Sequence, residues 1–67
     1  GFNPARFAVA EKNLLEGHEL FVATRGEENT DTLDSVQALV EFYEAWAAAE
    51  PGEGREEQAA QWKAVIP

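Results

Sequence analysis

The sequence predicts an all-α protein: a single antiparallel three-helix domain that spans residues 1–67. Three observations support this prediction. Apolar residues recur at helical spacing in three segments, and loops rich in Gly, Pro and Asn separate those segments. No segment alternates polar and apolar residues with a period of two, so we expect no β-sheet.

The first helix is predicted over about 4–25. Asn3 is a favoured N-cap residue, and Pro4 suits the first helical position because its missing N–H is not needed there. Gly26 is a typical residue beyond a helix end, and Arg25 places a cation at the negative end of the helix. An apolar stripe repeats along the segment at Phe7, Leu14 and Phe21.

The second helix is predicted over about 31–49, after the loop "GEENTDT". Asn29, Thr30 and Asp31 are each suited to cap it. Its apolar residues form two neighbouring stripes that together cover more than a third of the circumference, which indicates packing by two neighbours rather than one. The stripes contain Leu33, Val36, Leu39, Val40, Phe42, Tyr43, Trp46 and Ala47.

A shorter third helix is predicted over about 55–65. The stretch "EPGEG" separates it from the second helix, because Pro51 disfavours helical geometry at Glu50 and two glycines follow. Glutamates lie in its expected first turn and a lysine in its last, which matches the helix macrodipole. Its apolar edge consists of Ala59, Trp62 and Ile66.

Composition excludes several classes of function. Thirteen acidic and five basic residues give a formal net charge of −8, and the cations are scattered, so the chain is not expected to bind nucleic acid. No apolar run is long enough to span a membrane. The chain has no cysteine, and its first residues do not resemble a secretory signal, so a cytoplasmic location is expected.

No residue pattern indicates catalysis, a cofactor or a metal site. His18 is the only histidine, and no Ser or Thr lies at a sequence spacing that indicates a nucleophile–base pair. The acidic residues of the two loops lack the spacing of a calcium loop, so we interpret them as solvated and helix-start charges. The chain is therefore expected to be non-enzymatic, with no catalytic, cofactor-binding or metal-binding residues.

Three further residues carry structural expectations. Trp46 and Trp62 are expected to pack against each other where the second and third helices meet, because aromatic residues at helical spacing usually form a core. Gly17 lies within the first helix, where glycine is unfavourable relative to alanine. We interpret it either as a site of close approach to the second helix or as a neutral residue.

The stretch "FAVAEKNLLEGHELFVATRGEENTDTLDSVQALVEFYEAW" resembles the junction between two tetratricopeptide repeats of the kinesin-light-chain type. Ten residues stand where that pattern expects them: Phe7, Ala10, Glu11, Leu14, Gly26, Asp31, Thr32, Leu33, Leu39 and Tyr43. The sequence departs from the pattern where Asn29-Thr30 replaces the usual His-Pro, and the usual turn after the repeat's first helix is missing.

The segment that follows resembles the closing part of bacterial repeat arrays, some of which belong to large multidomain proteins such as serine/threonine kinases. The resemblance implies a partial array made of a second repeat helix, the next first helix and a short terminal helix. It also implies a scaffold that binds proteins, because neighbouring repeats stack and present an extended face to a partner.

Two functions follow from these expectations. The first is a non-catalytic interaction module, the capping end of an array, which presents an acidic face to a basic peptide or protein. Its candidate binding residues lie on the second helix: Asp34, Gln37, Glu41 and Glu44. The alternative is a self-associating helical domain. In that case Phe7 and Phe21 on the first helix, which lacks its own repeat partner here, are candidates to face solvent or another copy.

Overall fold

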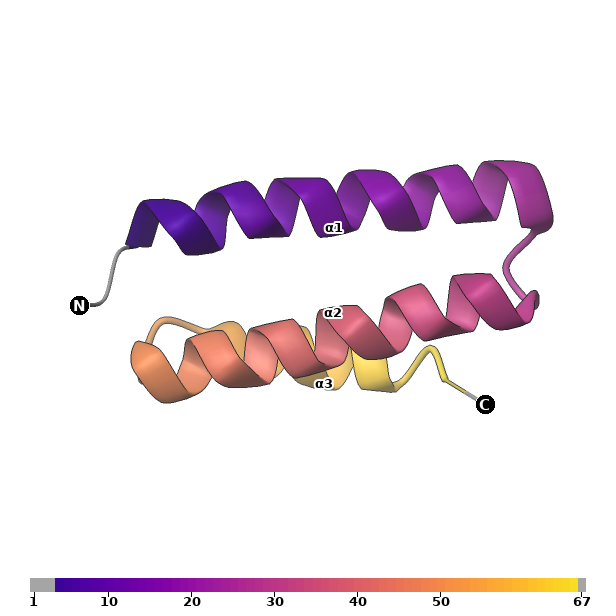
Figure 1. The fold of residues 1–67 in the computed structure, drawn as a ribbon. Helices are drawn as coiled ribbons and strands as arrows, with labels where there is room; N and C mark the ends of the chain where they lie inside the picture. The colour runs from indigo at the N-terminus through magenta and orange to yellow at the C-terminus, as the bar shows by residue number, and fades with distance from the viewer. Residues whose placement is uncertain (1–3, 67) are drawn as a thin grey trace.

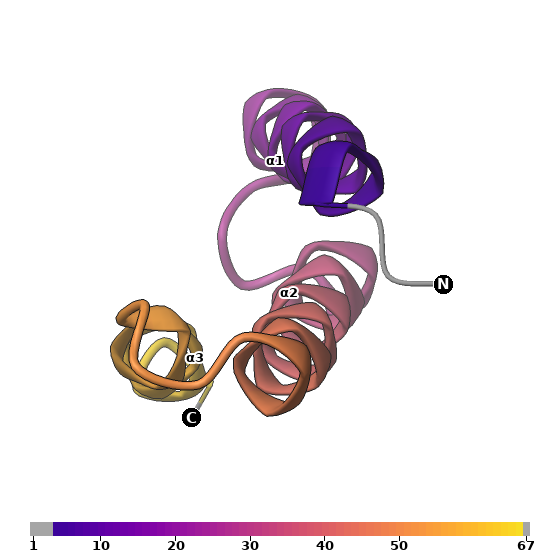
Figure 2. The same cartoon turned by 90° about the vertical axis from the view of Figure 1, so that its left-hand side faces the viewer.

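The computed structural model describes residues 4–66 and consists of three helices in this range, with no strand. Helix α1 spans Pro4–Arg25, α2 spans Thr30–Ala49 and α3 spans Arg55–Lys63. Consecutive helices run antiparallel (Figure 1). Figure 2 shows that α1 and α3 lie on two different sides of α2, so α2 is the central element. The all-α, three-helix prediction is confirmed.

The turn between α1 and α2 is built as its sequence predicts. Gly26 follows α1 with a φ of 87°, the left-handed conformation that glycine adopts without steric cost. Of the three candidate caps, Asn29 is the one used: its side-chain oxygen accepts a hydrogen bond of 2.9 Å from the Asp31 backbone N–H. Helix α2 therefore begins at Thr30, one residue before the predicted boundary. The expected cap at Asn3 lies outside the described residues.

Helix α2 supplies most of the buried core, as its broad apolar surface predicts. Seven residues of α2 are buried. In α3 only Ala59 is buried, and none of the described residues of α1 is. The central cluster is formed by Leu39, Tyr43, Trp46 and Ala59, with partly buried Phe7, Leu14, Leu15, Phe42 and Trp62 packed against it.

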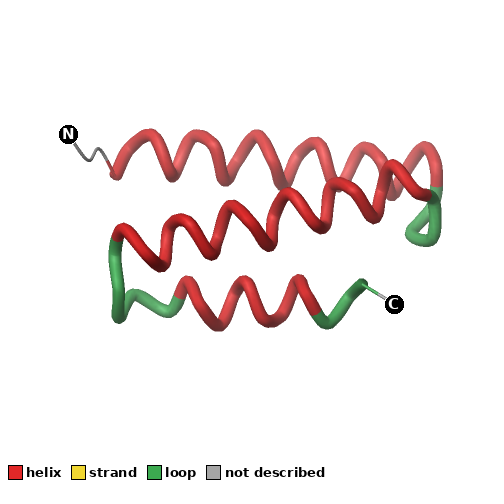
Figure 3. Tube along the Cα trace, turned by 60° about the horizontal axis from the view of Figure 1, so that its bottom comes forward, coloured by secondary structure: helices red, strands yellow, loops and turns green. Residues whose placement is uncertain are grey.

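The short linker between α2 and α3, visible as a tight loop in Figure 3, turns on two glycines. Gly52 and Gly54 have φ values of 86° and 81°, which an L side chain rarely adopts. Helix α3 ends at Lys63, two residues before the predicted end. The following backbone N–H groups of Val65 and Ile66 bond to carbonyls three residues earlier, at 3.0 and 3.2 Å, so the last turn tightens out of α-helical geometry.

The structure contradicts the predicted pairing of the two tryptophans. Trp46 stacks on Phe7 of α1, with ring centroids 5.2 Å apart and planes at 8°, and the Arg55 guanidinium lies 3.6 Å from the Trp46 ring centroid. Trp62 instead meets His18 edge-on, with centroids 5.0 Å apart. The reason is the offset along α3: Arg55 is the α3 residue level with Trp46, and Trp62 lies about two turns further along.

Two expectations for α1 are also wrong. Phe7 does not face solvent, because its ring stacks on Trp46. A Cβ built on Gly17 meets no atom within 4 Å, so this glycine does not mark a close approach to α2. The large apolar side chains that α1 does leave exposed are Val9 and Leu20, at 61% and 63% relative accessibility.

Candidate functional site

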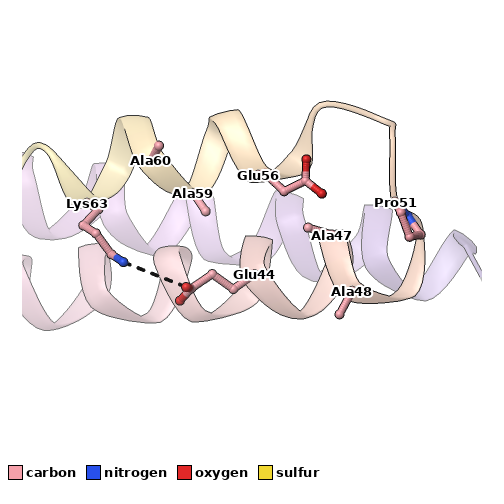
Figure 4. A pocket seen from close by; sticks show the side chains of 8 residues that line it. All are labelled: Glu44, Ala47, Ala48, Pro51, Glu56, Ala59, Ala60 and Lys63. Carbon is pink, nitrogen blue, oxygen red and sulfur yellow. Dashed lines mark ion pairs between the residues drawn. The ribbon is translucent and has the colours of Figure 1, made fainter.

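A groove with a volume of about 570 Å³ lies between α2 and α3. Figure 4 shows the groove from close by. Alanine methyl groups and Pro51 form most of its lining, and Glu44, Glu56 and Lys63 supply its polar atoms. The complete lining is Glu44, Ala47, Ala48, Pro51, Glu56, Ala59, Ala60 and Lys63.

Small residues create the groove. Ala47 and Ala59 are 7% and 5% exposed and lie where α2 and α3 pack together. Because alanine ends at its Cβ, the space above these two residues is left open. The sequence signals for this groove are the alanine-rich stretches "AWAAAE" and "EQAAQ", but alanine-rich helical sequence alone does not indicate a binding site.

The four predicted binding residues form a continuous exposed face of α2. Their spacing of three, four and three residues places Asp34, Gln37, Glu41 and Glu44 on one side of a helix, and all four are exposed. Because successive residues turn by about 100°, this side is roughly opposite the α1-facing side that carries Trp46. Glu44 belongs both to this face and to the lining of the groove.

We define the acidic surface as this α2 face together with the groove. Among the described residues of this surface, the one cation is Lys63, and its Nζ lies 3.9 Å from Glu44 Oε2 (Figure 4). Both side chains are more than half exposed, so this ion pair is strongly screened by solvent and contributes little to stability. Asp34, Glu41 and Glu56 carry further negative charge along the same surface.

A polar cluster on the α1-facing side of α2 ties all three helices together. Tyr43 of α2 donates a hydrogen bond of 2.8 Å to Glu11 Oε2 of α1, and Arg55 of α3 approaches the same oxygen at 4.0 Å. Arg55 also donates to Gln58 at 2.7 Å and covers the Trp46 ring. Arg55 thereby fixes the start of α3, which is one wall of the groove.

Burial perturbs the phenol in this cluster. The pKa of Tyr43 is raised from 10.0 to about 12, chiefly because burial disfavours the charged phenolate and also because the hydrogen bond and negative charge of Glu11 oppose ionisation. The positive charge of Arg55 lowers the pKa of Tyr43, but this effect is smaller than the effects that raise it. Tyr43 therefore remains a neutral hydrogen-bond donor at physiological pH.

A second polar contact joins His18 to Ser35, a pairing that the sequence reasoning missed because 17 residues separate them. His18 Nδ1 lies 2.9 Å from Ser35 Oγ. The Ser35 hydroxyl donates its single proton to the Thr32 carbonyl, so its oxygen is an acceptor for an N–H on Nδ1. A general base would instead accept the hydroxyl proton, so in this geometry the pair connects α1 to α2 rather than activating a nucleophile.

A cavity of about 280 Å³ adjoins this pair and is lined by His18, Val22, Glu27, Thr32, Val36, Trp62 and Val65. Within residues 4–66 no group of three His, Asp or Glu side chains is placed to hold a metal ion. None of the three described helices combines the length and hydrophobicity required to cross a membrane.

Comparisons of the chain with protein-family models, with curated proteins and with solved structures gave no match. The resemblance to tetratricopeptide repeats therefore depends on the sequence pattern described above, and the fold on the three helices themselves.

Proposed function

We propose that the chain is a non-catalytic interaction module, the capping segment of a tetratricopeptide-like array, which binds a basic peptide or protein through its acidic surface. The observation that carries this proposal is the exposure of Asp34, Gln37, Glu41 and Glu44 on one face of α2, next to a groove lined by alanine. Opposite charges speed the encounter and set the register of a partner, and the groove accepts its apolar side chains.

The arrangement of helices supports the array interpretation. Helix α2 is covered by α1 on one side and by α3 on another, as expected for the first helix of a repeat that contacts the helices before and after it. Helix α1 is covered on one side only by the described residues, with Val9 and Leu20 exposed. In an array, a preceding helix would cover these two side chains.

A titration of the isotope-labelled chain with a lysine-rich peptide tests the proposal. We expect amide shifts to move along α2 at the four face residues. The E41K variant should weaken binding by about two- to fivefold, the range of one or two exposed ion pairs. The E19K variant is the matched control, since Glu19 is also exposed but lies on α1. Unmoved α2 shifts at saturating peptide would contradict the proposal.

Self-association through α1 is the second candidate function, and the exposure of Val9 and Leu20 favours it. Eleven residues separate them, which is about three helical turns, so they lie on one side of α1. Sedimentation at high concentration tests this candidate. A monomer at every concentration, with V9E and wild type alike, would rule it out.

A further inference from the structure

We infer that the acidic surface accepts a second copy of this chain, whose α1 enters the α2–α3 groove with Val9 as the central side chain. This inference rests on the proposed binding role of the acidic surface, and it names the occupant. It differs from a symmetric pairing of two α1 helices, because here two different surfaces of the same chain meet.

The first surface is the outward side of the N-terminal half of α1. Val9 is 61% exposed at its centre. Arg6 and Lys12, both exposed, lie three residues before and after Val9. Since three residues turn by about 300° around a helix, the two cations project about 60° to either side of Val9. The helix therefore presents an apolar ridge with one positive charge on each flank.

The second surface is the groove, whose charged lining consists of two carboxylates and one cation, Lys63, which lies 3.9 Å from Glu44. Glu44 comes from α2 and Glu56 from α3, so the two opposing walls each carry a carboxylate (Figure 4). Ala47 and Ala59 lie between these walls and leave room for a side chain of the size of valine. An incoming ridge thus finds an apolar floor beneath Val9 and one carboxylate on each wall, and Glu44 is shared between an incoming cation and Lys63.

The remaining residues around Val9 are small, which allows the helix backbone to approach. Ala5, Ala10 and Asn13 line a shallow hollow of about 380 Å³ together with Arg6 and Val9. Packed helices lie about 8–10 Å apart, and the distance is shortest where small side chains meet. The alanines of the groove and the alanines of α1 therefore favour close packing between copies.

Symmetry and charge set the form and strength of the association. A contact between two different surfaces is head-to-tail, so a pair of copies retains one free groove on one copy and one free ridge on the other, and further copies can be added. The contact extends over only about two helical turns, which places it among weak interfaces. The net charge of −8 on each copy also opposes association, so we expect it at high chain concentration and physiological ionic strength.

Charge-reversal variants of the full chain test the inference by sedimentation equilibrium. E56K removes the acidic residue from the α3 wall of the groove. We expect it to weaken association by about fivefold or more relative to E57K, because an unfavourable pair replaces a favourable one. E57K is the matched control: Glu57 is exposed in the same helical turn and carries the same charge, but it does not line the groove.

Mixing variants provides the decisive measurement. R6E and K12E should each associate poorly alone, as should E56K. An equimolar mixture of E56K with one of the two α1 variants should recover association, because the reversed ridge meets the reversed groove. The α1 variant whose mixture with E56K recovers association identifies the cation that pairs with Glu56. Circular dichroism of each variant confirms that the helices are retained.

Three results would overturn the inference: a wild-type chain that stays monomeric at all concentrations, equal effects of E56K and E57K, or association that E56K leaves unchanged while V9E abolishes it. The last result would instead indicate symmetric α1 pairing. The lysine-rich peptide titration separates these failures from failure of the proposed function. A peptide that binds to a strictly monomeric chain leaves the acidic surface as a binding site and removes only the second copy as its occupant.

Discussion

At the residue scale, Tyr43 shows how one side chain connects burial, electrostatics and the position of the helices. The residue is 1% exposed, and its hydroxyl donates a hydrogen bond to Glu11 on α1. A buried hydroxyl must keep a partner, because leaving it unsatisfied costs about 1–3 kcal/mol. Tyr43 therefore fixes both the rotation of α2 against α1 and the carboxylate that Arg55 approaches.

The raised pKa of Tyr43 predicts a loss of stability in alkaline solution. The unfolded phenol ionises around 10.0, whereas the folded one does so at about 12, so between these values the unfolded state holds fewer protons. The stabilisation is complete below the lower value and is lost as the pH rises toward the higher one. Urea denaturation across this range should show a steeper decline for wild type than for Y43F.

The tyrosinate absorbance of the folded chain provides an independent check of this prediction, because Tyr43 is the only tyrosine. An absorbance midpoint at the value of a free phenol would contradict the buried environment. Y43F itself should unfold about 1 kcal/mol more easily than wild type at neutral pH, because it loses the hydrogen bond to Glu11.

Substitution of Gly17 is predicted to stabilise the fold, whereas Y43F is predicted to destabilise it. The space around it is open and its backbone is helical, so G17A should raise the free energy of unfolding by about 1 kcal/mol through helix propensity alone. G26A is the contrasting variant: a φ of 87° strains an alanine, and a loss of about 1 kcal/mol is expected. Chemical denaturation measures both. Destabilisation by G17A would indicate a contact that the structure does not show.

At the element scale, the two tryptophans hold α3 in place to different degrees. Trp46 is 4% exposed and contacts both neighbours of α2, through Phe7 and Arg55. Trp62 is only partly buried and meets the edge of His18. The first side chain therefore belongs to the centre of the core, and the second closes the far end of α3 over α1.

W46A should accordingly cost about 3–5 kcal/mol, the usual range for a fully buried large aromatic. W62A should cost about 2 kcal/mol, because part of its surface is already in water. Thermal and urea unfolding compare the two variants, and hydrogen exchange should show loosening confined to α3 in W62A. Equal losses of unfolding free energy in W46A and W62A would contradict the difference in burial between the two tryptophans.

At the scale of the whole molecule, net charge opposes the compact state. With a formal charge of −8 on 67 residues, folding brings like charges together. The ion pairs Arg25–Asp31 and Lys63–Glu44 are about half exposed or more and offset little of this repulsion. Repulsion is therefore expected to dominate the salt dependence of stability.

Urea midpoints should therefore rise as sodium chloride is increased from low ionic strength to about 0.15 M, where the Debye length falls to about 8 Å. E19K, which lowers the net negative charge by two, should be less sensitive to salt than wild type. Destabilisation by salt would instead show that the surface ion pairs outweigh the general repulsion.

The sequence by itself determined the elements of this protein: three helices, two glycine-containing turns, a central α2 and an exposed acidic face on it. These features depend on local chemistry, since a 3.6-residue period and capping residues act within one or two turns. Boundaries moved by at most two residues, because helix ends tighten or fray according to their surroundings.

Only the tertiary structure decided which side chains meet across the helices. It paired Trp46 with Phe7 and Arg55, joined His18 to Ser35, left Gly17 in open space and opened the alanine-lined groove beside Glu44. The relative rotation and offset of packed helices are set by how side chains interlock, and an offset of one turn changes every contact. That information is distributed over residues far apart in the chain and is absent from any single stretch of sequence.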